Sequence, residues 1–333
     1  MFWIKSTDDR TARKRTLMTM RSTVLFLVGL ILTAGWIVGC KQKQSPKPVV
    51  TLYTSIPEPV SSVMVNLFTR QTGIEVHVVR KPDSTADVYW EQGVFEMIGR
   101  ADAGALAKYS SPSADGVLTR YRDSQGFWAG AGLRARTIAY RADERWTRPP
   151  QGAWDLTNLE FKGRLVMAKP TIGLGGGYIA ALFQLWGDQK TREFFAALHR
   201  NDIRLVGNDA AVADDVGRGA FVAGFTNSND CAVILADGGK LESLLPDQKE
   251  MGTLVVPITV ALGIGADQQL PARQLVDYLL SQEIEQKLIQ MHYAGWSARQ
   301  ESADLKAMEV DYHQLASQIP KAIAESTAIL EGR

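Results

Sequence analysis

The chain has 333 residues, with 37 basic and 36 acidic side chains, so its formal net charge at pH 7 is +1. This near-neutral balance, without a Lys/Arg-rich patch in the part expected to fold, argues against a nucleic-acid-binding protein. The length permits one two-lobed domain or two ordinary domains, and the 45% content of hydrophobic residues is that of a globular protein.

The N-terminal segment, residues 1–39, has the pattern of an export signal. Basic residues precede an apolar run, Val24–Val38, and the segment leads into Ile37-Val38-Gly39-Cys40. A basic region, an apolar region and a small residue before the cleavage point are typical of a signal peptide. The last four residues resemble a lipobox. The pattern therefore predicts that Cys40 is lipidated, that residues 40–48 are a tether, and that the body lies on the periplasmic side of a membrane.

Two alternatives remain open for this segment. Translation from Met18 or Met20 gives a signal peptide of more typical length. An uncleaved transmembrane anchor is the other alternative, although the apolar run is shorter than the ~20 residues that a span prefers. With Cys40 lipidated, the second cysteine, Cys231, has no intramolecular partner, so the domain must be stable through its core alone.

The first part of the body alternates apolar strand patterns with amphipathic helix patterns. Apolar residues recur at helical spacing after Val60, and Gly73 ends that helix. The strands are predicted at Val49–Tyr53, Ile74–Val79 and Ala86–Tyr89, with a further helix near Gly93–Ala103. This βαβ rhythm predicts a parallel sheet with helices on its faces.

The stretch from Leu165 to Trp186 combines a strand, a glycine-rich loop and an apolar helix. The strand is predicted at Leu165–Ala168 and the helix at Tyr178–Trp186. Because this helix carries no charged residue, it is expected to be buried on all sides. A glycine-rich loop before a helix exposes backbone N–H groups at the positive end of the helix dipole, so the stretch predicts an anion site.

The remaining chain continues the alternation. A proline inside a predicted strand, Pro257, favours an edge or crossing segment. Further strands are predicted at Arg136–Tyr140, Ile203–Val206, Phe221–Phe225 and Gly252–Ile258. Helices are predicted at Trp154–Leu159, Arg192–Arg200, Ala210–Arg218, Cys231–Asp237, Ala272–Leu280, Glu283–Met291 and Gln314–Leu330.

Several motifs occur in an order that resembles a known family. They are VTLYTS, TGIEVHVV, ADVYWEQ, RARTIAYR, KGRLVMAKPTIGLGGGYIAALF, NDAAVADDVGRGAFVAGFTNSND and MGTLVVPITVALGIGA. In this order they resemble the extracellular solute-binding proteins of ABC transporters, in the branch named for ferric-iron-binding proteins. The resemblance covers about Val49–Leu280. It implies the α/β fold of a type II periplasmic binding protein, with two lobes of parallel-rich sheets flanked by helices and two crossing hinge strands.

The resemblance also implies a domain organisation and partners. Residues 49–140 and 256–333 would form lobe one, and residues 141–255 would form lobe two. The crossings would fall near Arg136–Tyr140 and near Leu254–Val260. Such a protein is expected to be a monomer without catalysis or cofactor, to bind its solute between the lobes, and to deliver it to an ABC permease and ATPase.

The chain departs from the iron ligands of that family. Iron-binding members use a histidine, a glutamate and two adjacent tyrosines, because Fe³⁺ prefers hard oxygen ligands. Here Ile56 stands where the histidine would be, and the loop Thr226–Cys231 has no tyrosine. Glu91 remains, and Asp230 could add a second carboxylate. Glu91 and Asp230 are the candidate metal ligands, because the one carboxylate and one amide of Glu91 and Gln92 alone cannot hold bare ferric iron.

The anion half of the family's site is matched better, by a Thr-Gly loop, two asparagine positions and an arginine. The alternative role for the glycines is close packing of a helix instead of anion binding. The alternative for either arginine is a surface position on a strand. The candidate ligand-binding residues are Thr54, Ser55, Glu91, Gln92, Arg134, Arg136, Thr171, Gly173, Gly175, Gly176, Asn208, Thr226, Asn227 and Asp230.

These observations predict a membrane-tethered binding subunit of an ABC importer. Its solute would be an iron(III) or other metal complex or a phosphate-type anion, and the residues favour an anion such as a phosphate ester or phosphonate. Two alternatives stay open: an exported enzyme that uses Cys231 or Glu91 near the anion loop, and a ligand sensor that partners a membrane kinase.

Overall fold

The computed structural model describes residues 47–333 with gaps at 83–84, 142, 145–147 and 267–268. The predicted signal peptide, Cys40 and most of the predicted tether therefore lie outside the described residues. Within the described part, no helix combines the length and the apolar character that a membrane span requires. Residues Lys47–Arg333 cluster as one unit.

Two groups of mostly parallel strands lie at the two ends of one sheet path, ordered β2-β1-β3-β10-β5-β8-β6-β7. Parallel pairs join β1 to β2 and β3, and β6 to β7 and β8, which confirms the predicted α/β fold with parallel-rich sheets. The first group comprises β1 (Val49–Thr54), β2 (Glu75–Val79), β3 (Val88–Glu91) and β4 (Leu106–Ala107). The second comprises β6 (Leu165–Ala168), β7 (Arg204–Val206), β8 (Ala223–Asn227) and β9 (Leu241–Leu244).

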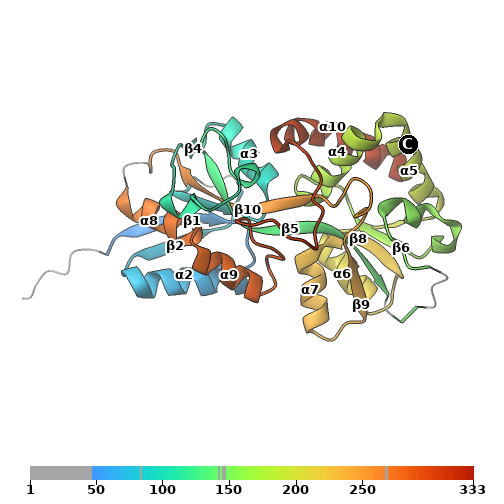
Figure 1. Cartoon of the computed structure of the whole chain (residues 1–333), viewed down its shortest axis with the longest axis horizontal. Coiled ribbons are helices and arrows are strands. Elements are labelled where there is room, and N and C mark those ends of the chain that lie inside the picture. The colour runs from blue at the N-terminus through green and yellow to red at the C-terminus, as the bar shows by residue number, and fades with distance from the viewer. Residues whose placement is uncertain (1–46, 83–84, 142, 145–147, 267–268) are drawn as a thin grey trace, which may run out of the picture. The chain divides into compact units, whose positions relative to one another are not determined.

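Two long antiparallel strands connect these groups, β5 (Trp128–Arg141) and β10 (Val255–Gly263), as Figure 1 shows. The first part of β5 pairs with β10, and from Arg136 onward β5 pairs with β8 and β9. The pairing of β5 and β10 shifts register between Pro257 and Thr259. Proline cannot donate to a ladder, so it sits where the ladder is interrupted. This is the predicted pair of crossing strands, although β5 begins earlier than predicted.

Helices pack on both groups of strands. On the side of the first group lie α2 (Glu58–Thr72), α3 (Val94–Asp102), α8 (Leu270–Leu279) and α9 (Gln282–Gln290). On the side of the second lie α4 (Leu174–Trp186), α5 (Asp188–Arg200), α6 (Asp209–Gly217) and α7 (Ser228–Ala236). The helix predicted at Trp154–Leu159 is instead two 3₁₀ turns, η3 (Ala153–Thr157) and η4 (Leu159–Phe161), which follow η1 (Pro112–Ala114) and η2 (Thr119–Tyr121).

The C-terminal helix α10 (Tyr312–Leu330) packs mainly against α4 and α5, and also against α3. Its apolar residues Ile319 and Ile323 lie on the bare face of Gly176 in α4. At its other end, Tyr312 donates a hydrogen bond of 2.7 Å to the Val255 carbonyl and meets the Phe95 ring edge-on. The sequence analysis expects residues 256–333 as a whole in lobe one, and within the structure the apolar face of α10 is buried largely on helices of the second group.

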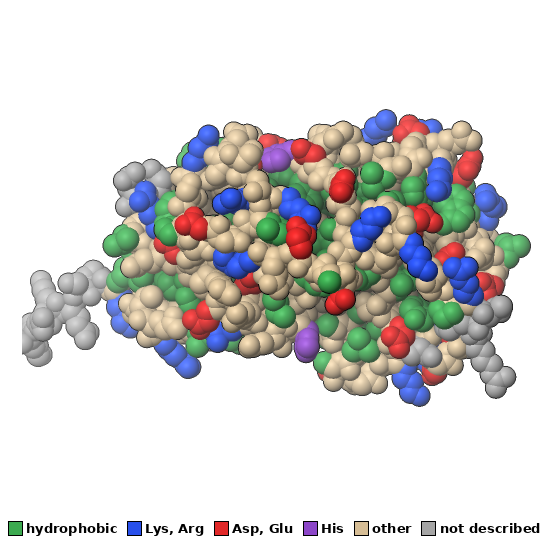
Figure 2. All heavy atoms as spheres, viewed as in Figure 1, with side chains coloured by type: hydrophobic (Ala, Val, Ile, Leu, Met, Phe, Trp, Pro, Cys, Tyr) green, Lys and Arg blue, Asp and Glu red, His purple; other side chains and the backbone are tan. Residues whose placement is uncertain are grey.

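The apolar helix α4 begins earlier than predicted and is not buried throughout. Its residues from Gly176 to Leu182 are buried, whereas Leu185 in the last turn is 39% exposed. The predicted loop glycines Gly175–Gly177 form the first helical turn. Gly173, the residue before the helix, has φ of +124°, a backbone conformation that favours glycine. On the face of the molecule in Figure 2, acidic and basic side chains are interspersed.

A buried carboxyl precedes β10 and predicts a pH dependence of stability. Asp247 Oδ1 accepts a hydrogen bond from the Ala153 N–H at 3.3 Å, and Oδ2 has no partner among the described residues. Burial raises the pKa of Asp247 from 3.8 to about 6. The folded-state pKa lies above the unfolded value. The contribution of Asp247 to the free energy of unfolding is therefore fully present below about pH 4 and is lost as the pH rises to about 6.

Asp247→Asn should therefore flatten this slope and raise the free energy of unfolding at pH 7 by about 1–3 kcal/mol, since one pKa unit corresponds to about 1.4 kcal/mol. Urea unfolding at several values between pH 4 and pH 7.5 measures both effects. Asp237→Asn, at the exposed end of α7, is the matched control and should leave the slope unchanged. If the free energy of unfolding had the same pH dependence in the wild type and in Asp247→Asn, Asp247 would not be its cause.

Candidate functional site

A cavity of about 300 Å³, here called the polar cavity, lies where the first turns of four helices meet. Every helix supplies residues at or next to its N-terminus, where the backbone carries partial positive charge. The contributing residues are Gln92, Gly93 and Glu96 for α3, Gly173–Gly175 for α4, Asn208–Ala210 for α6, and Asn227 and Asp230 for α7. The cavity is therefore lined by both groups of elements, next to the crossing strand β5.

Arg134, on β5, is the buried cation of the polar cavity. Arg134 is only 3% exposed. Nε donates to Asn229 Oδ1 at 2.9 Å, and Nη1 donates to the Gln92 carbonyl at 2.9 Å. The second terminal nitrogen, Nη2, makes no hydrogen bond to any residue that the structure describes. The guanidinium is thus held by protein groups while one nitrogen stays available to a ligand.

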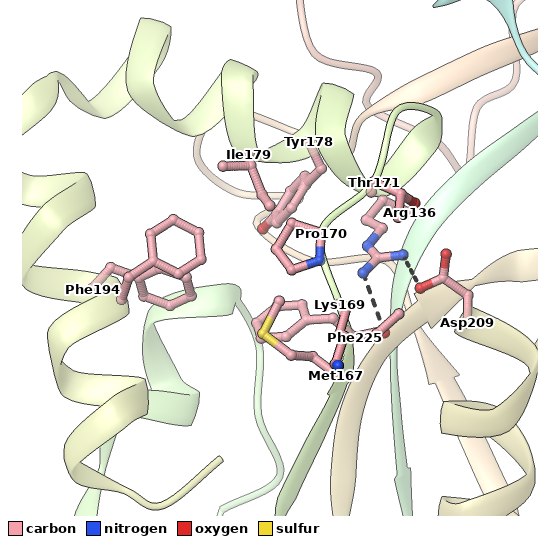
Figure 3. Close-up of a pocket in the computed structure, with 13 residues that line it drawn as sticks. Arg136, Met167, Lys169, Pro170, Thr171, Tyr178, Ile179, Phe194, Asp209 and Phe225 are labelled. Carbon is pink, nitrogen blue, oxygen red and sulfur yellow. Dashed lines mark hydrogen bonds and ion pairs between the residues drawn. The ribbon is translucent and has the colours of Figure 1, made fainter. Parts of the chain in front are cut away.

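Arg136 is engaged within the protein instead. Nη1 donates to Asp209 Oδ1 at 2.6 Å and to Asn227 Oδ1 at 3.0 Å, and Nη2 donates to the Phe225 carbonyl, as Figure 3 shows for Asp209 and Phe225. Arg136 lines a separate cavity of about 20 Å³ below Thr171 and Tyr178. The two predicted arginines therefore differ: Arg134 faces the polar cavity, and the charge of Arg136 is compensated by Asp209.

The glycines at the start of α4 have two different roles. Gly173 and Gly175 line the polar cavity together with Thr171, as predicted for an anion loop. The first turn of α4 has no side-chain cap, so its N–H groups face the cavity without a capping oxygen. Gly176 and Gly177 pack closely instead: an added Cβ would lie 2.4 Å from the Thr171 carbonyl oxygen and 2.0 Å from the Phe95 ring, respectively.

The predicted residues of the second group mostly fix one another. Thr226 Oγ1 donates to the Asp209 carbonyl at 2.7 Å, and Asn208 Oδ1 caps α6 by accepting from the Ala211 N–H at 2.9 Å. Asn227 Nδ2 lies 3.1 Å from Asp209 Oδ2 and 3.0 Å from Asp230 Oδ2. Burial raises the pKa of Asp230. Asn208, Asn227 and Asp230 line the polar cavity, whereas Thr226 is fully buried behind it.

The predicted residues of the first group divide between two cavities. Gln92 lines the polar cavity, and Thr54 is fully buried. Ser55 Oγ donates to Glu91 Oε2 at 2.5 Å, and Arg100 Nε donates to Glu91 Oε1 at 2.8 Å. Ser55 and Glu91 line a neighbouring cavity of about 740 Å³, here called the apolar groove, whose wall includes Tyr53, Tyr89, Phe95, Ile98, Ile172 and Ile319.

The structure does not bring the two candidate metal ligands together. Glu91 lines the apolar groove and is paired with Arg100, whereas Asp230 lines the polar cavity. Across the residues with a described position, no group of three or more His, Cys, Asp or Glu is arranged to hold a metal ion. Cys231 is buried against Thr137, with 3.7 Å between Sγ and Oγ1, and burial raises the pKa of its thiol. It lines neither cavity.

Glu96 is a site residue that the sequence prediction missed, as are Lys169 and Asp209. It lies in the first turn of α3 and lines both the polar cavity and the apolar groove. Its Oε2 is buried and has no hydrogen-bond partner among the described residues. Burial raises the pKa of this carboxyl. The available signal was its position three residues after Gly93, at the start of a helix that follows a predicted strand end.

Solved structures with this fold share 18–20% sequence identity with the chain. The ferric binding protein from Campylobacter jejuni matches with a TM-score of 0.73 at 19% identity, covering 84% of this chain and 99% of that one. The periplasmic binding protein AfuA from Actinobacillus pleuropneumoniae, solved with exogenous fructose-6-phosphate bound, matches with a TM-score of 0.73 at 20% identity, covering 86% and 99%. The similarity confirms the type II periplasmic binding protein fold.

Sequence comparison gives the family. An uncharacterized protein of Haemophilus influenzae is 26% identical over 216 residues, which are 61% of this chain and 60% of that relative's length. The family model described as "Bacterial extracellular solute-binding protein" matches residues 50–294, most of the described part and both groups of strands. The chain therefore belongs to the family of bacterial extracellular solute-binding proteins.

Proposed function

We propose that this protein is the solute-binding subunit of an ABC importer and that it captures a phosphate-type anion, such as a phosphate ester or phosphonate, in the polar cavity. One observation carries the proposal. Arg134 is buried, held by Asn229 and the Gln92 carbonyl, and lines the polar cavity together with the uncapped first turn of α4. A planar guanidinium next to a helix N-terminus is suited to an oxyanion.

The chemistry of the cavity favours an anion over ferric iron. A hard trivalent cation needs several oxygen ligands, and phenolates supply charge in iron carriers. Here Asp209 is paired with Arg136, Asp230 accepts from two asparagines, and neither Tyr53 nor Tyr89 lines the polar cavity. The bound fructose-6-phosphate of AfuA supports a phosphate-type ligand on this fold. An iron complex fits the residues less well.

The proposed transport cycle uses the crossing strands. Residues 49–140 and 256–333 form one lobe in this proposal, and residues 141–255 form the other. The strands β5 and β10 serve as the hinge about which the lobes close on the solute. A lipid at Cys40 tethers the monomer on the periplasmic side, where it delivers the solute to a permease and its ATPase without catalysis of its own.

A ligand screen tests the proposed substrate. Thermal shift and calorimetry on the protein should detect inorganic phosphate, methylphosphonate or a sugar phosphate, and not ferric ion or ferric citrate. A ligand at ten times its dissociation constant should stabilise the fold by roughly 1.4 kcal/mol. Tight binding of free Fe³⁺ with a tyrosinate charge-transfer band, or no response to any phosphate or phosphonate, would contradict the proposal.

A further inference from the structure

Glu96 lies between the starts of two helices from different strand groups. A Cβ built on Gly93, which precedes α3, would lie 3.0 Å from Glu96 Oε2. A Cβ built on Gly173, which precedes α4, would lie 2.9 Å from Glu96 Oε1. A side chain at either glycine would crowd the carboxyl and force it to shift. Because Gly93 and Gly173 have no side chain, there is room for the Glu96 carboxyl between the two helix starts. Glu96 lines both the polar cavity and the apolar groove there.

The protein leaves one oxygen of this carboxyl without a partner in the described residues. Oε2 is buried without a hydrogen-bond partner in the described part of the chain, and native proteins seldom leave such an oxygen unpaired. The neighbouring cation Arg134 donates its Nε and Nη1 hydrogen bonds to Asn229 and to the Gln92 carbonyl, and not to Glu96. Because Glu96 lines the polar cavity, a ligand there that carries a proton can supply the missing partner.

The charges around Glu96 make the proton necessary. Burial disfavours its negative form most, and so the pKa of Glu96 is raised; a hydrogen bond from its own backbone N–H favours the negative form, Glu91 on β3 repels it, and Arg134 on β5 and Arg100 on α3 attract it. Asp209, Asp230 and Lys169 line other parts of the polar cavity. An ionised Glu96 beside an anion without a proton would place two acceptors against each other, which is unfavourable in a poorly hydrated site.

We propose that Glu96 makes the site select oxyanions that carry a proton, such as hydrogen phosphate or the monoanion of a phosphate ester or phosphonate, over oxyanions that carry none, such as sulfate. The inference rests on the proposed anion site and adds the residue that sets its specificity. A protonated ligand brings the shared proton with it. Sulfate can share a proton only after Glu96 has taken one from solvent, so its binding must weaken as the pH rises.

Calorimetry with inorganic phosphate and sulfate at pH 6 and pH 8 tests this. At pH 8 the wild type should bind phosphate at least 100-fold more tightly than sulfate. Glu96→Gln, which always offers an amide N–H, should reduce that ratio to less than tenfold and remove the pH dependence of sulfate binding. Asp102→Asn, at the other end of α3 and lining only the apolar groove, is the control and should keep the wild-type ratio.

A second measurement does not depend on a variant. Titrations in two buffers with different ionisation enthalpies should show proton uptake by the wild type on binding sulfate at pH 8, and much less on binding phosphate. Equal affinity of the wild type for both anions, or an unchanged ratio in a folded Glu96→Gln, would overturn the inference alone. Failure of the wild type to bind either anion would overturn the proposed anion site as well.

Discussion

Arg134→Ala should lower the affinity for the anion at least 100-fold while the protein stays folded. The substitution removes the buried guanidinium that lines the polar cavity and whose Nη2 has no hydrogen-bond partner in the described part of the chain. Truncating one side of a buried, hydrogen-bonded charge pair costs about 2–5 kcal/mol, and 100-fold corresponds to about 2.7 kcal/mol. The backbone N–H groups of α4 remain and account for residual binding.

Calorimetry with inorganic phosphate or methylphosphonate measures this loss. Lys169→Ala is the matched control, because Lys169 also lines the polar cavity but is exposed. An exposed cation contributes about 0.2–1 kcal/mol, so this variant should lose less than tenfold. Arg134→Lys keeps the charge but loses the planar guanidinium. Its affinity for the anion should lie between those of Lys169→Ala and Arg134→Ala. Comparable losses in Lys169→Ala and Arg134→Ala would mean that the anion is held at the exposed rim.

The two arginines illustrate what the sequence could predict about the site. Arg134 and Arg136 lie two residues apart on one strand, so their side chains share a face of the sheet, and the pattern offered both as ligands. Only tertiary packing separates them: Asp209, at the start of α6, reaches Arg136, whereas Asn229 and Gln92 hold Arg134. Partners this far apart in sequence leave no local signal.

The same limit applies to the strands and glycines. Strands rich in Val, Ile and Leu, such as β1 and β6, were predicted within a residue or so because their pattern is local. The first half of β5 reads WAGAGLRA, and its small residues have little strand propensity, so pairing with β10 decides it. Gly175–Gly177 looked like a loop, yet packing against Phe95, Thr171 and α10 makes them helical.

Gly177→Ala should separate α3 from α4. The new methyl would lie 2.0 Å from Cε2 and 2.5 Å from Cζ of Phe95. Phe95 is 3% exposed and is held by the edge-on contact with Tyr312, so the ring has little room to move. Overpacking of this kind costs about 1–3 kcal/mol. Because α3 and α4 both line the polar cavity, their separation should weaken anion binding by a similar free energy, or about 10- to 100-fold.

Gly99→Ala is the matched control on α3, since a Cβ there meets no atom within 4 Å. It should leave binding unchanged and stabilise the helix by about 0.5–1 kcal/mol. The double variant Gly177→Ala with Phe95→Leu tests the mechanism, because a smaller side chain makes room for the methyl. Calorimetry and urea unfolding should show that Phe95→Leu recovers much of the loss, a coupling expected only for residues in contact. Additive losses would instead mean that Gly177 matters for the first turn of α4 alone, and that the contact between α3 and α4 does not set the affinity of the cavity.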